Sequence, residues 1–143
     1  RILEEWRRAA KTPLQRLEAE NAVRQFLDDF PEAIRPDPVD LRPYWLPDPG
    51  DVHILALAAV HHADAIITHN KKDFPQAELN TYGITRIDPD AQLLQLYKLH
   101  GTALMDQLRP VLAEVQSAHP QIPALELWRK AWLPQFGRKF DRL

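Results

Sequence analysis

Apolar residues recur at helical spacing along most of the chain, which predicts a series of helices with one buried face each. The second of these begins at Thr12-Pro13, where a capping hydroxyl precedes a proline at the first helical position. Proline at position 110 should kink or split a later helix, because it lacks the backbone N–H that the helix ladder needs. The expected helices cover residues 2–10, 12–29, 91–99, 102–118, 124–132 and 134 to the end.

The centre of the chain, residues 46–74, predicts a buried helix followed by a buried strand. Asp48-Pro49-Gly50-Asp51 combines an N-cap acid, an N1 proline and an acid in the first turn, where the helix dipole favours a negative charge. The residues from Ile54 to Ala59 are all apolar, so little of this helix should face water. Ala65-Ile66-Ile67-Thr68 is short and β-branched, as interior strands of parallel sheets are.

Two further strands are expected around this unit. Residues 82–87 read as a strand, and Asp88-Pro89 after them repeats the cap-then-proline helix start. A short strand is also expected near Ala33-Ile34, within a segment rich in proline.

Polar residues gather where the central strand ends, at Thr68, His69 and Asn70. In open α/β sheets, binding residues collect beyond the carboxyl ends of strands, so a site is expected here. Residue chemistry alone leaves simpler roles open for the nearby acids. Asp48 is either a helix cap or a ligand, Asp51 can serve the helix dipole, and Asp73 can be an ordinary turn residue.

Composition narrows the function classes. A chain of 143 residues fits one domain with a real core, and it contains no apolar run of membrane-spanning length and no visible signal peptide. The absence of cysteine excludes disulfides and thiolate metal sites and favours a cytoplasmic location. With a formal net charge of -2, a nucleic acid would have to be held by local basic patches. Because the chain starts at Arg1 inside an expected helix, we expect an N-terminal portion to be missing.

The central stretch resembles the PIN-domain family of metal-dependent ribonucleases, which includes the VapC-type toxins of bacterial toxin–antitoxin pairs. The resemblance rests on three segments in matching order and spacing, Leu46 to Ala56, Ala63 to Asn70 and Lys72 to Pro75. It implies an α/β fold, a PIN-like parallel sheet flanked by helices. Residues 1–90 would form the PIN-like domain without its first strand, and residues 91–143 would form a helical C-terminal extension packed on it.

The resemblance also implies the site. Its helical acid pattern, Ile-Leu-x-Glu, falls on Glu5, and the implied catalytic residues are Glu5, Asp51, Asn70 and Asp73. Of these, the three carboxylates would hold Mg²⁺ or Mn²⁺, which prefer hard oxygen ligands and activate a bound water. Two departures stand out. Asn70 is neutral where many relatives carry an acid, and the acid of the first strand has no counterpart, so the nuclease site is incomplete in this chain.

Substrate contacts are implied for three more residues. Thr68 would hydrogen-bond a site carboxylate or water, and Lys71 and Lys72 would meet RNA phosphates, although a solvated lysine pair is the alternative. Glu4 is the alternative to Glu5 as the helical acid of the site, although Glu4 can instead form an ion pair with Arg8, four residues further along the helix. Zinc is disfavoured because the histidines lack zinc-site spacing; they are His53, His61, His62 and His69.

The expected function is therefore a metal-dependent endoribonuclease, the toxin of a toxin–antitoxin pair, with an antitoxin partner and homodimerisation implied by the resemblance alone. A degenerate PIN-like module that binds RNA or a protein without cleavage is the alternative. A third reading, a small phosphotransferase or dehalogenase, is opposed by Asp51, because such enzymes have no need of an acid at that helix start.

Overall fold

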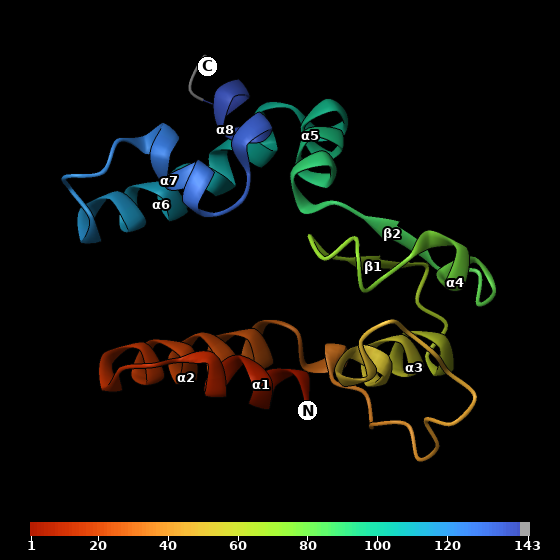
Figure 1. Cartoon of the computed structure of the whole chain (residues 1–143). Helices are drawn as coiled ribbons and strands as arrows, with labels where there is room; N and C mark the ends of the chain where they lie inside the picture. Colours follow the sequence, from red (N-terminus) through yellow and green to blue (C-terminus); the bar gives the residue numbers. More distant parts are fainter. Residues whose placement is uncertain (141–143) are drawn as a thin grey trace. The chain divides into compact units, whose positions relative to one another are not determined.

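The computed structural model describes residues 1–140 of the chain (Figure 1). Helices hold 63% of the residues and strands only 4%. The chain divides into two compact units. The first comprises Arg1–Ala65 and Lys72–Thr85, and the second comprises Ile66–Lys71 and the chain from Arg86 onwards.

The expected parallel sheet flanked by helices is wrong. Among the described residues, the only strands are β1 (Ala65–Ile67) and β2 (Thr85–Ile87), which pair in parallel as one two-stranded sheet. The strand expected near residue 33 does not form, since Pro31–Ala33 is a 3₁₀ turn, η1. Each short β-branched run was long enough for one strand, but the flanking sequence folds into helices and supplies no further strands to extend the sheet.

The other regular elements of both units are helices (Figure 1). Those of the first unit are α1 (Ile2–Ala9), α2 (Pro13–Asp29), the 3₁₀ turn η2 (Pro49–Asp51), α3 (Val52–Val60) and α4 (Gln76–Asn80). Those of the second unit are α5 (Pro89–His100), α6 (Thr102–Ala118), α7 (Ala124–Lys130) and α8 (Pro134–Phe140). Pro110 lies inside α6 without splitting it, contrary to one of the two outcomes expected from the sequence.

The helix starts follow the capping chemistry read from the sequence, and these predictions are confirmed. Thr12 and Gln15 form a reciprocal capping box at the start of α2. The Asp88 carboxylate accepts hydrogen bonds from the backbone N–H groups of Asp90 and Ala91 at the start of α5. Asp48 accepts from the N–H of Gly50 at 2.7 Å, at the entry to η2 and α3.

In the core of the first unit, Leu55 and Ala56 of α3 are fully buried. Phe74, from the segment after β1, is buried as well. This burial holds the start of α3, with its acids, at a fixed place in the unit. The other buried apolar residues assigned to this unit include Val23, Leu46, Leu79 and Ile84.

The second unit is built on an aromatic cluster. Trp128 meets Phe136 edge to face, with ring centroids 5.5 Å apart, and Met105 and Phe140 complete the buried set. Gly137 is required for this packing, because a Cβ there would come within 2.8 Å of Cγ of Trp128. The cluster draws together α6, α7 and α8.

A buried carboxylate joins α5 to α8. Asp90, only 3% exposed, accepts hydrogen bonds from the backbone N–H groups of Gln135 and Phe136 at 2.9 and 2.8 Å. These N–H groups lie in the first turn of α8, where the helix itself offers them no partner. Asp90 therefore acts as a cap supplied from a segment 45 residues away in the sequence.

We expect Asp90→Ala to destabilise the protein by about 1–3 kcal/mol, because it leaves one buried and one partly buried N–H group without an acceptor. Chemical denaturation followed by circular dichroism measures the change. Asp106→Ala is the matched control, since Asp106 is exposed on α6 and should change the free energy of unfolding by less than about 0.5 kcal/mol. Equal stability of the two variants would contradict the capping role.

Candidate metal site

Three carboxylates of the first unit converge. Asp48, Asp51 and Asp73 each present an oxygen, and these oxygens all lie within 4.8 Å of one another. Asp48 is exposed, while Asp51 and Asp73 are half-buried. We call this group the acidic cluster. It combines two segments, the turn that opens α3 and the loop between β1 and α4.

The turn η2 explains how two of these acids come together. Asp48 and Asp51 are three residues apart, and a 3₁₀ turn has three residues per turn, so their side chains leave the backbone on the same side. Asp48 is held in place by its hydrogen bond to the N–H of Gly50. A Cβ at Gly50 would lie 3.0 Å from Oδ1 of Asp48, so glycine leaves room for that close approach.

The surroundings of Asp51 disfavour its ionisation. Burial raises the pKa of Asp51, and the negative charges of Asp48, Asp73 and Glu5 raise it further, while His53 opposes the rise. Clustered carboxylates behave in this way when no cation neutralises them. The electrostatics therefore favour a positive ligand at the cluster.

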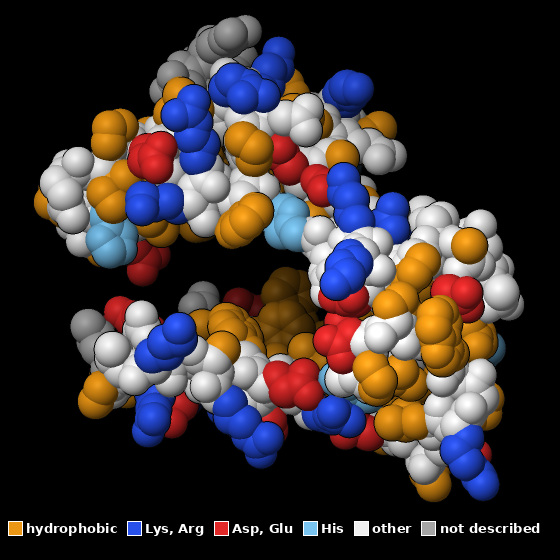
Figure 2. Space-filling view, in the orientation of Figure 1, with side chains coloured by type: hydrophobic (Ala, Val, Ile, Leu, Met, Phe, Trp, Pro, Cys, Tyr) orange, Lys and Arg blue, Asp and Glu red, His pale blue; other side chains and the backbone are white. Residues whose placement is uncertain are grey.

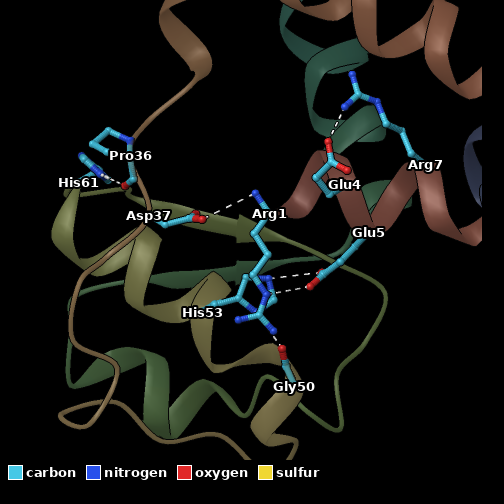
Figure 3. Close-up of polar contacts among 9 residues, drawn as sticks. All are labelled: Arg1, Glu4, Glu5, Arg7, Pro36, Asp37, Gly50, His53 and His61. Carbon is cyan, nitrogen blue, oxygen red and sulfur yellow. Dashed lines mark hydrogen bonds and ion pairs between the residues drawn. The ribbon is translucent and has the colours of Figure 1, made fainter.

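Glu5 lies close enough to Asp51 to affect its pKa, but its carboxylate contacts Arg1 and His53 (Figure 3). One carboxylate oxygen accepts from Nε of Arg1 at 3.0 Å, and the other lies 3.3 Å from Nε2 of His53. The second is an ion-pair distance without hydrogen-bond alignment. Glu5 thus affects the pKa of Asp51 through its charge but is not one of the three converging ligands. The pairing of Glu4 with Arg8, which the sequence left open, does not form, and Glu4 pairs with Arg7 instead.

His53 connects α1 to the turn that carries the acids. Its side chain is buried in the first turn of α3, and Nδ1 lies 2.7 Å from the carbonyl oxygen of Gly50. A carbonyl only accepts, so Nδ1 donates this hydrogen bond and Nε2 faces Glu5. His53 therefore lies between the acid of α1 and the turn that holds Asp48 and Asp51.

Thr68, Asn70 and Lys71 belong to the second unit, whereas the acidic cluster belongs to the first. The Thr68 hydroxyl accepts from the N–H of Asn70 at 3.0 Å, which closes a local turn. Nζ of Lys71 lies 3.6 Å from a carboxylate oxygen of Asp88, and Nδ1 of His69 lies 3.9 Å from the same oxygen. Lys71 therefore has a carboxylate partner within its own unit.

The neighbours of Asp88 lower the pKa of its carboxylate. Burial raises the pKa of Asp88, but four other groups lower it, and their combined effect is larger, so the pKa is lowered overall. These groups are the N–H groups of Ala91 and Asp90 and the charges of Lys71 and His69. Its ionised form is thereby stabilised as the cap of α5.

Lys72 belongs to the first unit, is exposed and directly precedes Asp73 of the acidic cluster. The histidines form no metal site with the acids, since no histidine joins the one metal-capable group found within residues 1–140. His61, for example, lies 3.1 Å from the carbonyl oxygen of Pro36 through its Nε2.

The sequence interpretation missed Asp48 as a cluster member, leaving it between cap and ligand. The structure gives it the capping hydrogen bond to Gly50 and also a place in the acidic cluster. The signal was present in the spacing Asp48-Pro49-Gly50-Asp51, which sets two acids on one side of a 3₁₀ turn. The pairing of His53 with Glu5 had no such local signal, because the two residues are 48 positions apart.

The donor set fits a hard divalent cation. Three carboxylates offer oxygen ligands only, which suits Mg²⁺, Mn²⁺ or Ca²⁺ and not a metal that prefers nitrogen or sulfur. Glu5 adds a further negative charge nearby.

Comparison with protein-family models, with curated proteins and with solved structures gave no significant match. The resemblance to PIN-domain ribonucleases therefore stays a prediction. Within residues 1–140, no helix combines the length and apolar character needed to cross a membrane.

We expect Asp51→Asn to raise the melting temperature of the metal-free protein at pH 7 by a few degrees. A carboxyl whose pKa is raised on folding adds stability while it is protonated, and this stability is lost as the pH rises through the folded-state pKa. The advantage of the variant should therefore shrink as the pH is lowered to about 4, because the raised pKa makes Asp51 take up its proton at a higher pH than an ordinary aspartate does. Melting in EDTA at both pH values measures it, with Asp64→Asn, an exposed acid, as the control. A destabilised Asp51→Asn at pH 7 would contradict the repulsion.

Proposed function

We propose that this chain is a divalent-cation-dependent endoribonuclease whose site is the acidic cluster of Asp48, Asp51 and Asp73. The observation that supports the proposal best is the convergence of the three carboxylates within 4.8 Å. The raised pKa of Asp51 supports it as well, since burial raises it most and the negative charges of the neighbouring acids raise it further.

Each residue has a role in this proposal. Asp51 and Asp73 hold Mg²⁺ or Mn²⁺, and Asp48 adds a third oxygen while its other bond keeps the turn in place. When bound, the cation lowers the pKa of a water ligand and neutralises charge on the phosphate. Glu5, fixed by Arg1 and His53, adds negative charge at the edge of the site, and Lys72 offers a cation for a neighbouring phosphate.

RNA as substrate, a role as toxin of a toxin–antitoxin pair, an antitoxin partner and homodimerisation rest on the resemblance of three central segments to PIN-domain ribonucleases. The roles of Thr68, Asn70 and Lys71 rest on it too. The proposal includes a cytoplasmic location, which the absence of cysteine favours.

A second candidate is a module that binds RNA or a protein without cutting. It is favoured by Glu5, whose two carboxylate oxygens already face Arg1 and His53. A residue engaged in this way is less available as a metal ligand, and the neutral Asn70 adds no charge.

Cleavage of a mixed single-stranded RNA pool in the presence of Mn²⁺ tests the first candidate. We expect cleavage that EDTA abolishes and that Asp51→Asn and Asp73→Asn each reduce at least about 100-fold, because each removes a ligand from the cation. Asp64→Asn, which removes an exposed acid outside the cluster, should keep full activity. Unchanged cleavage by Asp51→Asn would show that the site lies elsewhere.

Thermal melting with added Mn²⁺ separates the two candidates without relying on cleavage. At about 100 times its dissociation constant, a cation that binds only the folded chain adds about 2.7 kcal/mol of stability. We expect this gain for the unaltered protein and for Asp64→Asn, but not for Asp51→Asn. A protein that binds RNA yet shows no gain with Mn²⁺ fits the second candidate.

A further inference from the structure

A basic groove lies between α1 and α2 of the first unit. One hollow of about 320 Å³ is lined by both helices, and an adjoining hollow of about 350 Å³ shares Arg7 and Glu20 with it. We call the two together the arginine groove. Its lining residues are Arg7, Arg8, Arg16, Glu20, Arg24 and Leu27.

Helical spacing explains the groove. Arg16, Glu20 and Arg24 follow one another at intervals of four residues, so they form one stripe along α2. The stripe spans roughly 12 Å from Arg16 to Arg24, at 1.5 Å per residue. Arg7 and Arg8 come from α1, which packs against α2. Figure 2 shows Lys and Arg side chains, in blue, over these two helices.

The groove concentrates positive charge on a chain whose formal net charge is -2. Four of its six lining residues are arginines, against a single glutamate. Arg7 pairs with Glu4, but within residues 1–140 the structure gives no ion pair or side-chain hydrogen bond to Arg8, Arg16 or Arg24. These three arginines are exposed, so packing does not account for them.

The lining favours a phosphate backbone over an acidic protein. The guanidinium group presents a planar fork of donors that matches phosphate oxygens in pairs. Protein–protein interfaces usually have an apolar centre, and Leu27 is the only apolar one among the described residues that line the groove. A polyphosphate strand needs no apolar contact and is held by grooves of this kind.

The groove also shares a helix with the proposed site. Glu5, whose charge acts on Asp51, and Arg8 lie one turn apart on α1, about 4.5 Å along its axis. We propose that the arginine groove binds the phosphate backbone of single-stranded RNA and so extends the substrate-binding surface beyond the acidic cluster. This inference rests on the proposed function for its choice of RNA.

Binding of a fluorescently labelled single-stranded RNA of mixed sequence, measured by anisotropy in EDTA over a range of salt concentrations, tests the groove without cleavage. We expect the triple variant Arg8→Gln, Arg16→Gln, Arg24→Gln to bind about tenfold more weakly at low salt. The slope of log K against log salt should fall by about 2, at roughly 0.7 for each phosphate that the variant no longer neutralises. The matched control removes three exposed cations of the second unit, Lys98, Lys130 and Arg138, each changed to Gln, and should bind within about twofold of the unaltered protein.

A second variant keeps the test decisive if the triple variant fails to fold. Glu20→Gln removes the one acid of the groove, so we expect it to bind RNA several-fold more tightly. Equal weakening by the triple variant and its control, no change with Glu20→Gln, or binding of a synthetic polyglutamate peptide in preference to RNA would each overturn the proposal.

The same assay distinguishes this proposal from the nuclease proposal. Asp64→Asn, which changes an exposed acid outside both the acidic cluster and the arginine groove, should bind RNA in EDTA as the unaltered protein does. If RNA binding depends on the groove but no metal-dependent cleavage occurs, the nuclease proposal is wrong and the groove proposal stands. If cleavage occurs and the groove variants bind and cleave RNA as the unaltered protein does, the groove proposal is wrong and the nuclease proposal stands.

Discussion

The hydrogen bond from the N–H of Gly50 to the Asp48 carboxylate is the constraint on which the first unit's site depends. It forms the turn that opens α3, and that turn sets Asp48 and Asp51 on one side. The carbonyl of the same Gly50 accepts from His53, which in turn faces Glu5 on α1. A two-residue contact thus sets where two of the three acids of the cluster, Asp48 and Asp51, lie.

The arrangement concentrates opposite charges on different parts of one unit. Burial and the neighbouring acids raise the pKa of Asp51, while the arginine groove gathers cations, three of which have no ion pair within the described residues. A bound cation would relieve the repulsion at the acidic cluster, and the exposed guanidinium groups of the groove would attract an anion. We propose a cation at the first and a phosphate backbone at the second, the two kinds of ligand that a metal-dependent nuclease would use.

Helical packing organises the chain more than strand pairing does. The two short strands contribute few ladder bonds, whereas the aromatic cluster and the buried Asp90 tie the helices of the second unit together. Segments that resemble those of a sheet-based family therefore occur in a mostly helical protein. Local helix-then-strand patterns in a sequence do not determine how many strands will meet.

The sequence by itself determined the helix starts at Thr12, Asp48 and Asp88, because capping joins residues only two or three positions apart. It also indicated Asp51 and Asp73 as candidates, although it left Asp48 undecided between cap and ligand. Only the tertiary structure decided that Asp73 meets the other two acids, that Glu5 pairs with His53 and that Asp90 caps α8. Those contacts join segments 22 or more residues apart, and their formation depends on how the helices pack, which no local pattern records.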